Sequence, residues 1–154
     1  MVKIIRKIID VLLIITIVFL AGYYILRLSG RAEIYNVVTG SMEDHIHVGD
    51  YILIYRKNDY QIGDVVTFKE KDSMITHRII REENGYFITK GDANNTEDEK
   101  ISKDKIVGKA ILIGGLLNIV INYKYAIIGI LLSMYLIGWI IDDLTKKEEN
   151  TKNE

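Results

Sequence analysis

The sequence predicts a small, mostly antiparallel β domain flanked by two transmembrane α-helices. Long uncharged apolar runs lie near both ends of the 154-residue chain. Between them, short runs rich in β-branched and aromatic residues alternate with turn residues, which is typical of strands. We expect an N-terminus and first helix over residues 1–28, a β domain over 29–122, a second helix over 123–143 and a charged tail over 144–154.

The two apolar runs have the composition of membrane spans. Residues 11–26 and 125–141 contain sixteen and seventeen residues without a charge. As helices they cover roughly 25 Å each, slightly less than a bilayer core of about 30 Å, so flanking residues must complete each span. Lys3 and Arg6 are placed to reach the interface. Two buried core helices are the alternative, but a middle region this small could not enclose them.

The first run could also be a cleaved signal peptide, because it has a basic start. No A-x-A-like site follows it, since the run ends in YYILRLSGR, and we therefore expect a retained anchor. Basic residues precede the first run and follow the second, which favours two cytoplasmic termini and an extracytoplasmic middle region in a cell membrane. Arg27 and Arg31, on the far side of the first span, weaken this charge asymmetry.

The middle region shows six runs of strand-forming residues with turn signals between them. Asn84-Gly85 separates two of these runs and strongly indicates a hairpin, because both residues tolerate positive φ. The expected strands cover residues 32–39, 51–55, 64–69, 74–81, 86–89 and 106–113.

Three other segments are assigned by composition. Residues 91–105 are polar and predict a solvated loop. Residues 116–122 are apolar, and either lie on the membrane surface or continue the sheet. Residues 145–154 are highly charged and predict disorder.

Composition also excludes several classes of function. The net charge is −1, so the chain has no overall basic character for nucleic acid. It has no cysteine, which rules out disulfides and thiolate chemistry. His45 and His47 have a spacing that could bind a metal, but no third ligand is evident. We expect neither a metal nor a cofactor.

Ser41 is a candidate nucleophile. It follows Gly40 at the end of an expected strand, and Gly40 can adopt a backbone conformation that other residues resist, which would expose the hydroxyl. A serine needs a base to react at neutral pH. Gly-Ser alone is weak evidence, because most such pairs are ordinary loop residues.

His77 is the better candidate base, because a strand holds its side chain in a fixed direction. The alternative is a half-buried structural histidine. Asp92 and Asp98 follow in the polar loop, and either could orient His77 if strands 74–81 and 86–89 pair. The sequence gives no geometry that would choose between them.

The order of four segments resembles a type I signal peptidase. Residues 38–43 (VTGSME) with 48–50 (VGD) resemble the nucleophile motif, and residues 63–66 (GDVV) resemble the next motif. Residues 75–80 (ITHRII) resemble the base motif, and residues 90–94 (KGDAN) with Asp98 resemble the acidic motif. The typical bacterial enzyme has a lysine where this chain has His77. A histidine there marks the endoplasmic-reticulum type, which also occurs in archaea and some Gram-positive bacteria.

The resemblance implies a membrane-bound serine endopeptidase that removes signal peptides from exported preproteins. It implies that Ser41 is the nucleophile, His77 the general base, Asp98 the orienting carboxylate and Asp92 a supporting one. It also implies an oxyanion hole formed by the Thr39 hydroxyl and the Ser41 N–H. Substrates would bind extended beside an edge strand, with small residues at the first and third positions before the cut.

Two positions depart from the family pattern. Asp44 replaces the proline of Ser-Met-x-Pro, which puts the rigidity of that loop in doubt. Ala93 interrupts the usual Gly-Asp-Asn-Asn, which weakens the assignment of Asp92 more than that of Asp98. The alternatives are a non-catalytic membrane-tethered β module that binds an extracytoplasmic partner, and a dedicated peptidase for a few pilin, biofilm or spore-coat precursors. The sequence leaves open whether the chain acts alone or in a membrane complex.

Overall fold

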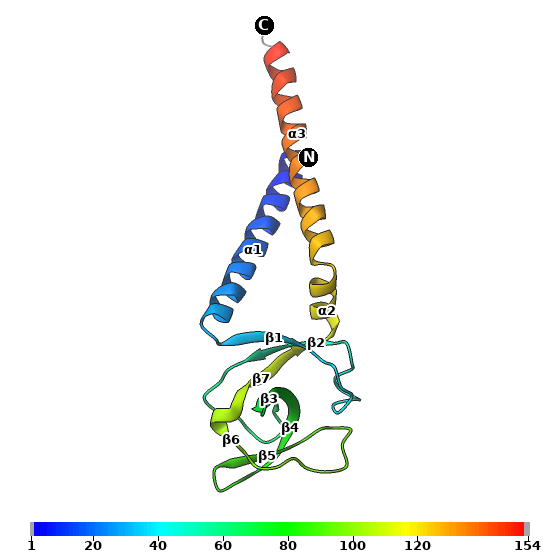
Figure 1. Ribbon diagram of the computed structural model, residues 1–154. Coiled ribbons are helices and arrows are strands. Elements are labelled where there is room, and N and C mark those ends of the chain that lie inside the picture. Colours follow the sequence, from blue (N-terminus) through cyan, green and yellow to red (C-terminus); the bar gives the residue numbers. More distant parts are fainter. Residues whose placement is uncertain (1, 153–154) are drawn as a thin grey trace. The chain divides into compact units, whose positions relative to one another are not determined.

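The computed structural model describes residues 2–152. It confirms the predicted fold class, an antiparallel β domain with a long apolar helix at each end (Figure 1). The chain divides into two compact units, which are treated separately below. One contains residues 23–119 and the other contains residues up to 22 together with those from 120 onward.

Helices α1 (Val2–Leu28) and α3 (Lys124–Lys152) have the length and composition to cross a membrane. Their apolar segments have mean hydropathies of 2.5 and 1.9, and no residue of either span window is buried. A core helix of a soluble protein would bury one face, so the exposure agrees with lipid contact. Arg6 of α1 forms an ion pair with Asp142 of α3. The side chain of Lys3, expected at the interface, lies outside the described part.

The charged tail differs from its prediction as a disordered segment. Helix α3 continues through it to Lys152, and residues 153–154 lie outside the described range. Lys147 lies 3.0 Å from Asp143, one helical turn earlier, and such pairs of opposite charge stabilise a helix.

The β domain is a single seven-stranded sheet in which every recorded pair is antiparallel. The strand order is β1-β2-β7-β3-β4-β5-β6. All six predicted strands are present with shifts of up to three residues at their ends, and the two-residue β6 was not predicted. The first strand ends at Asn36 rather than at residue 39, so Ser41 lies in a loop and does not directly follow a strand. The strands are β1 (Ala32–Asn36), β2 (Tyr51–Tyr55), β3 (Val65–Glu70), β4 (Ser73–Glu83), β5 (Tyr86–Lys90), β6 (Ile101–Ser102) and β7 (Ile106–Ile113).

The hairpin between β4 and β5 is confirmed. Asn84 and Gly85 have φ values of 50° and 80°, so both turn residues use the left-handed region as expected. The segment after it, expected to be an entirely solvated loop, contains β6 and a short 3₁₀ helix, Lys103–Lys105. Ile101 of β6 is 5% exposed and anchors this segment in the core.

Residues 115–122 form helix α2 (Gly115–Asn122) rather than a further strand. The Asn118 side chain attaches α2 to the start of β2, because it accepts the Tyr51 N–H at 2.7 Å and donates to Asp50 at 2.7 Å. Asp50 also accepts the His47 N–H, and these hydrogen bonds hold the pKa of its carboxyl below the usual value.

Two clusters of buried side chains form the core. One lies around strands β3, β4 and β5, and the other lies between β2 and the segment that follows β1. The first contains Tyr60, Val66, Phe68, Ile79, Phe87, Ile101 and Ile106. The second contains Met42, Ile46, Ile52 and Ile54.

Candidate active site

Ser41 lies in the connection between β1 and β2, and buried side chains that follow it in the chain hold this connection against the core. Met42 and Ile46 are 2% and 1% exposed and pack with Ile52 and Ile54. Burying two large side chains on either side of one turn holds the backbone in place, while the Ser41 residue itself remains partly accessible.

The backbone of this turn differs from the expectation in one respect. Gly40 does not adopt a left-handed conformation, and the left-handed residue is instead Asp44, with φ of 86°. A Cβ atom at Gly40 would lie 3.0 Å from the exposed Glu43 side chain, which would have to shift slightly to make room for it. The family's proline could not replace Asp44 on this backbone, because proline fixes φ near −65°.

His77 lies on β4, between its neighbours β3 and β5, and is 6% exposed. The Phe68 ring contacts it edge-on, with the centroids 6.3 Å apart. The Nε2 atom lies 3.0 Å from the Ser41 hydroxyl oxygen, which is hydrogen-bonding distance.

Asp98 lies on the other side of the imidazole. Its Oδ2 atom is 2.6 Å from His77 Nδ1 and accepts the Thr89 hydroxyl at 2.7 Å. A carboxylate against Nδ1 favours the tautomer that carries its proton there, and Nε2 is then free to accept the proton of Ser41. The three side chains therefore form a continuous hydroxyl–imidazole–carboxylate chain, the arrangement that activates a serine.

Asp92 binds a different partner. Its two carboxylate oxygens accept from Nε and Nη2 of Arg78 at 2.9 and 2.6 Å, and Arg78 also donates to the Gly63 carbonyl at 3.0 Å. The guanidinium lowers the pKa of Asp92, and the carboxylate raises that of Arg78. His45 Nδ1 lies 3.3 Å from the same carboxylate. Asp92 thus joins the segments around Gly63, Arg78 and His45.

The segment that follows β5 also contacts the backbone of Ser41. Ala93 donates its N–H to the Ser41 carbonyl at 3.0 Å, and Asp92 donates its N–H to the Met42 sulfur at 3.4 Å. A Cβ atom at Gly91 would lie only 2.5 Å from the Ser41 carbonyl oxygen. This close approach requires glycine at 91, whereas Ala93 contributes only its backbone, so the departure at 93 leaves the contact intact.

A cleft of about 620 Å³ opens beside Ser41 and His77. Its lining includes no Asp, Glu, Lys or Arg side chain, so an uncharged peptide segment could enter without a desolvation penalty for a charge. Thr39 lines the cleft together with Ser41. Burial and a hydrogen bond to Glu33 raise the pKa of Tyr35, another lining residue, to about 12, which keeps its hydroxyl neutral. The cleft is lined by Tyr35, Asn36, Val37, Val38, Thr39, Ser41, Met42, Ile46, Ile52, Thr67, Ser73, Met74, Ile75, Thr76, His77 and Asn94.

His45 and His47 face separate carboxylates. His45 is near Asp92, whereas His47 Nδ1 lies 3.6 Å from Asp50. Within residues 2–152, no group of three or more His, Cys, Asp or Glu side chains has the arrangement of a metal site.

Sequence reasoning missed two residues that shape this site. Thr89 was identified only as the end of a strand, and Gly91 only as part of a motif. Neither carries a signal of its own, because each matters through a contact with a residue distant in the sequence, Asp98 for Thr89 and Ser41 for Gly91.

An antiparallel β domain that carries a serine, a histidine and an aspartate in hydrogen-bonding sequence has the architecture of a serine peptidase. Comparison with known proteins agrees. The Peptidase S24-like family model matches residues 20–111. Because this match covers more than half of the chain, the protein belongs to the Peptidase S24-like family, and its relatives place it among the endoplasmic-reticulum and archaeal-like type I signal peptidases.

Three relatives illustrate the similarity. The signal peptidase complex catalytic subunit SEC11C of Rattus norvegicus is 30% identical over 127 residues, which cover 67% of this chain and 66% of the rat protein. The catalytic subunit SEC11 of Plasmodium falciparum is 30% identical over 125 residues, or 67% and 68% of the two chains. The SEC11 subunit of Metarhizium robertsii is 33% identical over 92 residues, or 49% and 54%. The chain thus spans slightly less than two thirds of the rat relative.

Proposed function

We propose that this protein is a membrane-anchored serine endopeptidase that removes signal peptides from exported preproteins. The observation that carries the proposal is the pair of contacts made by His77, 3.0 Å to the Ser41 oxygen and 2.6 Å to Asp98. Membership of the signal peptidase group supplies the substrate class.

The proposed reaction is acyl transfer. His77 Nε2 takes the Ser41 proton as the hydroxyl oxygen attacks the scissile carbonyl carbon. Asp98 holds the Nδ1 proton and stabilises the imidazolium that forms. The imidazolium then protonates the leaving amine, and a water molecule, activated by the same imidazole, hydrolyses the acyl-enzyme and restores Ser41.

The oxyanion of each tetrahedral intermediate is assigned to the Ser41 N–H and the Thr39 hydroxyl. The presence of Thr39 and Ser41 in the lining of one cleft supports this assignment. One such donor typically contributes about 10²–10³ in rate, because it is already oriented toward the charge that develops.

The cleft supports an extended substrate. Its lining comes largely from residues 35–39, which end and follow β1, and from residues 73–77 of β4. An extended peptide between two such segments can use main-chain hydrogen bonds for affinity and place alternate side chains in the cleft. The buried side chains of Met42 and Ile52 form part of that lining and favour small apolar residues before the cut.

We place the β domain on the extracytoplasmic side, with both termini in the cytoplasm. Two helices with the length to span a membrane, one before and one after the β domain, return the chain to the side on which it began. The ion pair between Arg6 and Asp142 supports this arrangement, because these residues lie near the N-terminal end of α1 and in the C-terminal half of α3. Anchoring also raises the local concentration of substrates whose apolar segment is already in the bilayer.

The decisive experiment uses the full chain in membranes with a reporter preprotein. Ser41→Ala and His77→Ala should each abolish cleavage, whereas the matched histidine variant His47→Ala should cleave normally because the His47 side chain is exposed and does not line the cleft beside Ser41. Normal processing by the Ser41→Ala protein would overturn the serine mechanism.

Two further measurements address the rival functions. A serine-directed mechanism-based inhibitor should label Ser41, and a non-catalytic binding module would not be labelled. Comparison of the exported proteins of cells with and without the gene distinguishes a general enzyme from one dedicated to a few precursors. The relatives are named as subunits of a signal peptidase complex, and purification of the tagged chain in mild detergent tests whether this protein also has partner subunits.

A further inference from the structure

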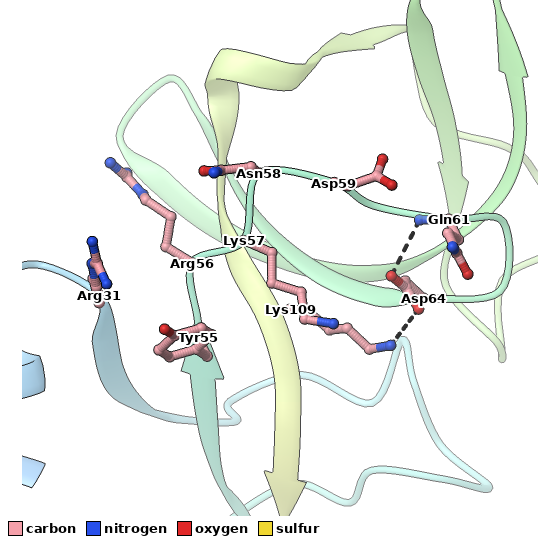
Figure 2. Close-up of a pocket in the computed structure, with 9 residues that line it drawn as sticks. All are labelled: Arg31, Tyr55, Arg56, Lys57, Asn58, Asp59, Gln61, Asp64 and Lys109. Atoms are coloured by element: carbon pink, nitrogen blue, oxygen red, sulfur yellow. Dashed lines mark hydrogen bonds and ion pairs between the residues drawn. The ribbon is translucent and has the colours of Figure 1, made fainter.

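A second cleft, of about 560 Å³, lies outside the candidate active site and is predominantly basic (Figure 2). It carries four basic and two acidic side chains, and it shares no residue with the cleft beside Ser41. Its lining residues are Arg31, Tyr55, Arg56, Lys57, Asn58, Asp59, Gln61, Asp64 and Lys109.

The charges in this cleft are unevenly distributed. Lys109 Nζ lies 2.5 Å from Asp64, so these two charges balance each other. Arg31 and Arg56 are exposed and form no ion pair with any residue in the described range 2–152. Figure 2 shows their guanidinium groups on one side of the cleft, away from the Lys109–Asp64 pair. Arg56 Nε donates to the Val107 carbonyl at 3.4 Å, and Asp59 forms no ion pair with either arginine in the described range. The cleft therefore presents two guanidinium groups that lack a carboxylate partner.

Backbone hydrogen bonds connect Arg31 to the last turn of α1 and connect Arg56 to Arg31. Arg31 lies three residues beyond Leu28, and its N–H donates to the Leu26 carbonyl in the last turn of α1 at 3.0 Å. The Arg56 N–H donates to the Arg31 carbonyl at 2.8 Å, which places the backbone of Arg56 beside that of Arg31. Three residues span at most about 10 Å, which is comparable with the thickness of a lipid headgroup layer.

We propose that Arg31 and Arg56 bind the phosphate of an anionic phospholipid headgroup, on the side of the membrane where the β domain lies. A guanidinium group binds phosphate through two parallel N–H donors, and two such groups in one cleft suit a single phosphate. The proposal rests on α1 crossing the bilayer. It commits to a lipid rather than a soluble phosphate because the hydrogen bond from Arg31 to Leu26 fixes the site at the end of a membrane helix.

The bound headgroup would hold the β1–β2 end of the sheet at the membrane surface. It also accounts for a feature that opposes the expected orientation, namely arginines on the side where basic residues are usually fewer. Lipid binding involves no cleavage step, so this proposal is tested independently of the roles of Ser41 and His77.

The test measures lipid retained by the full chain in detergent, by native mass spectrometry, with no substrate present. The unmodified protein should retain phosphatidylglycerol in preference to phosphatidylcholine. Arg31→Gln/Arg56→Gln should weaken phosphatidylglycerol retention by about thirtyfold, from the usual contribution of a basic residue near an anionic membrane. Lys69→Gln/Lys105→Gln is the matched control, because it removes the same charge from exposed residues outside the cleft and should retain lipid normally.

Two further arms complete the test. Arg31→Lys/Arg56→Lys keeps the charge without the planar donor pair and should show an intermediate loss. Inorganic phosphate added to lipid-free protein should bind far more weakly than the phospholipid. Equal retention of the two lipids by the unmodified protein would overturn the proposal whether or not the variants fold. Equal losses in the cleft variant and its control would also overturn it, as would phosphate binding as tight as lipid binding.

Discussion

Thr89 and Asp98 are joined by two hydrogen bonds, one from backbone to backbone and one from side chain to side chain. The Asp98 N–H donates to the Thr89 carbonyl at 2.9 Å, and the Thr89 hydroxyl donates to Asp98 Oδ2 at 2.7 Å. The same Oδ2 atom faces His77 Nδ1. Because Thr89 is fully buried, water cannot easily replace its hydroxyl, and Thr89 fixes the direction of the carboxylate that orients the histidine.

Replacing Thr89 with valine should therefore lower activity through His77 rather than through substrate binding. Thr89→Val keeps the shape and removes a hydrogen bond to a charged group, which typically contributes about 1.5–3 kcal/mol. We expect kcat to fall about tenfold or more with little change in KM. Thr89→Ser restores the donor and should recover most of kcat. Equal kcat values for the valine and serine variants would exclude this positioning role.

The two aspartates should differ in what they control. Asp98→Asn can present an amide donor to Nδ1 and favour the wrong tautomer, so kcat should fall by about 10⁴, as in other enzymes with this arrangement. Asp92→Asn leaves the His77 contacts in place and removes the charge that pairs with Arg78. It should mainly lower the thermal unfolding temperature. Cleavage kinetics and unfolding curves of both variants check this, and a reversed pattern would contradict the assignment.

Gly91→Ala should reduce activity by displacing the nucleophile. The new Cβ would approach the Ser41 carbonyl oxygen to 2.5 Å, so one of the two segments must move. Displacements of about 1 Å at a reacting group can cost about 10²-fold in rate.

The control is Ala93→Asn, which restores the residue usual in the family. It should stay close to the parent in kcat, because Ala93 is exposed and acts through its backbone N–H. Parallel losses in both variants would argue against the close contact as the cause.

The fold was largely predictable because its signals are local. Apolar runs without charge predict α1 and α3, and Asn84-Gly85 predicts the β4–β5 hairpin from two adjacent residues. Strand β6 has no such signal, since two residues carry no recognisable alternation. Helix α2 is connected to the sheet through hydrogen bonds of Asn118 with Asp50 and Tyr51, which are distant in the sequence.

The candidate site was predictable only where a motif preserved it. Ser41 and His77 were identified by their order among four motifs, and the family resemblance favoured Asp98 over Asp92, although the sequence alone gives no geometry that separates them. The choice depends on contacts in the folded chain: Asp98 hydrogen-bonds to Thr89 in β5, whereas Asp92 pairs with Arg78. These are tertiary contacts, and neither residue type nor local periodicity encodes them.

Asp44 provides a test of the turn after Ser41. Its φ of 86° lies in the left-handed region, which glycine adopts freely and proline cannot adopt. Asp44→Gly should stay within about 1 kcal/mol of the parent in unfolding free energy, because relief of strain and added freedom of the unfolded chain oppose each other. Asp44→Pro, the family's usual residue, should destabilise by more than that and reduce cleavage. A proline variant as stable and active as the parent would show that this turn has a different backbone.

Stability should fall in acid, and Asp92 should account for part of the fall. Arg78 binds the charged carboxylate and lowers the pKa of Asp92 in the folded protein below its value in the unfolded chain, which is about 3.9. Between these two values the unfolded chain binds more protons, so stability rises with pH there. The contribution is complete above about pH 5, falls progressively as the unfolded chain takes up protons, and is lost as the pH falls through the lowered folded-state pKa. The amide side chain of the Asp92→Asn variant does not titrate, so the unfolding temperature of this variant should change less between pH 5 and pH 3 than that of the parent, measured by circular dichroism in detergent.

Asp50 keeps a lowered pKa in that variant, so a smaller acid dependence should remain. An Asp92→Asn protein with the same acid dependence as the parent would show that the Arg78 contact does not stabilise the folded state.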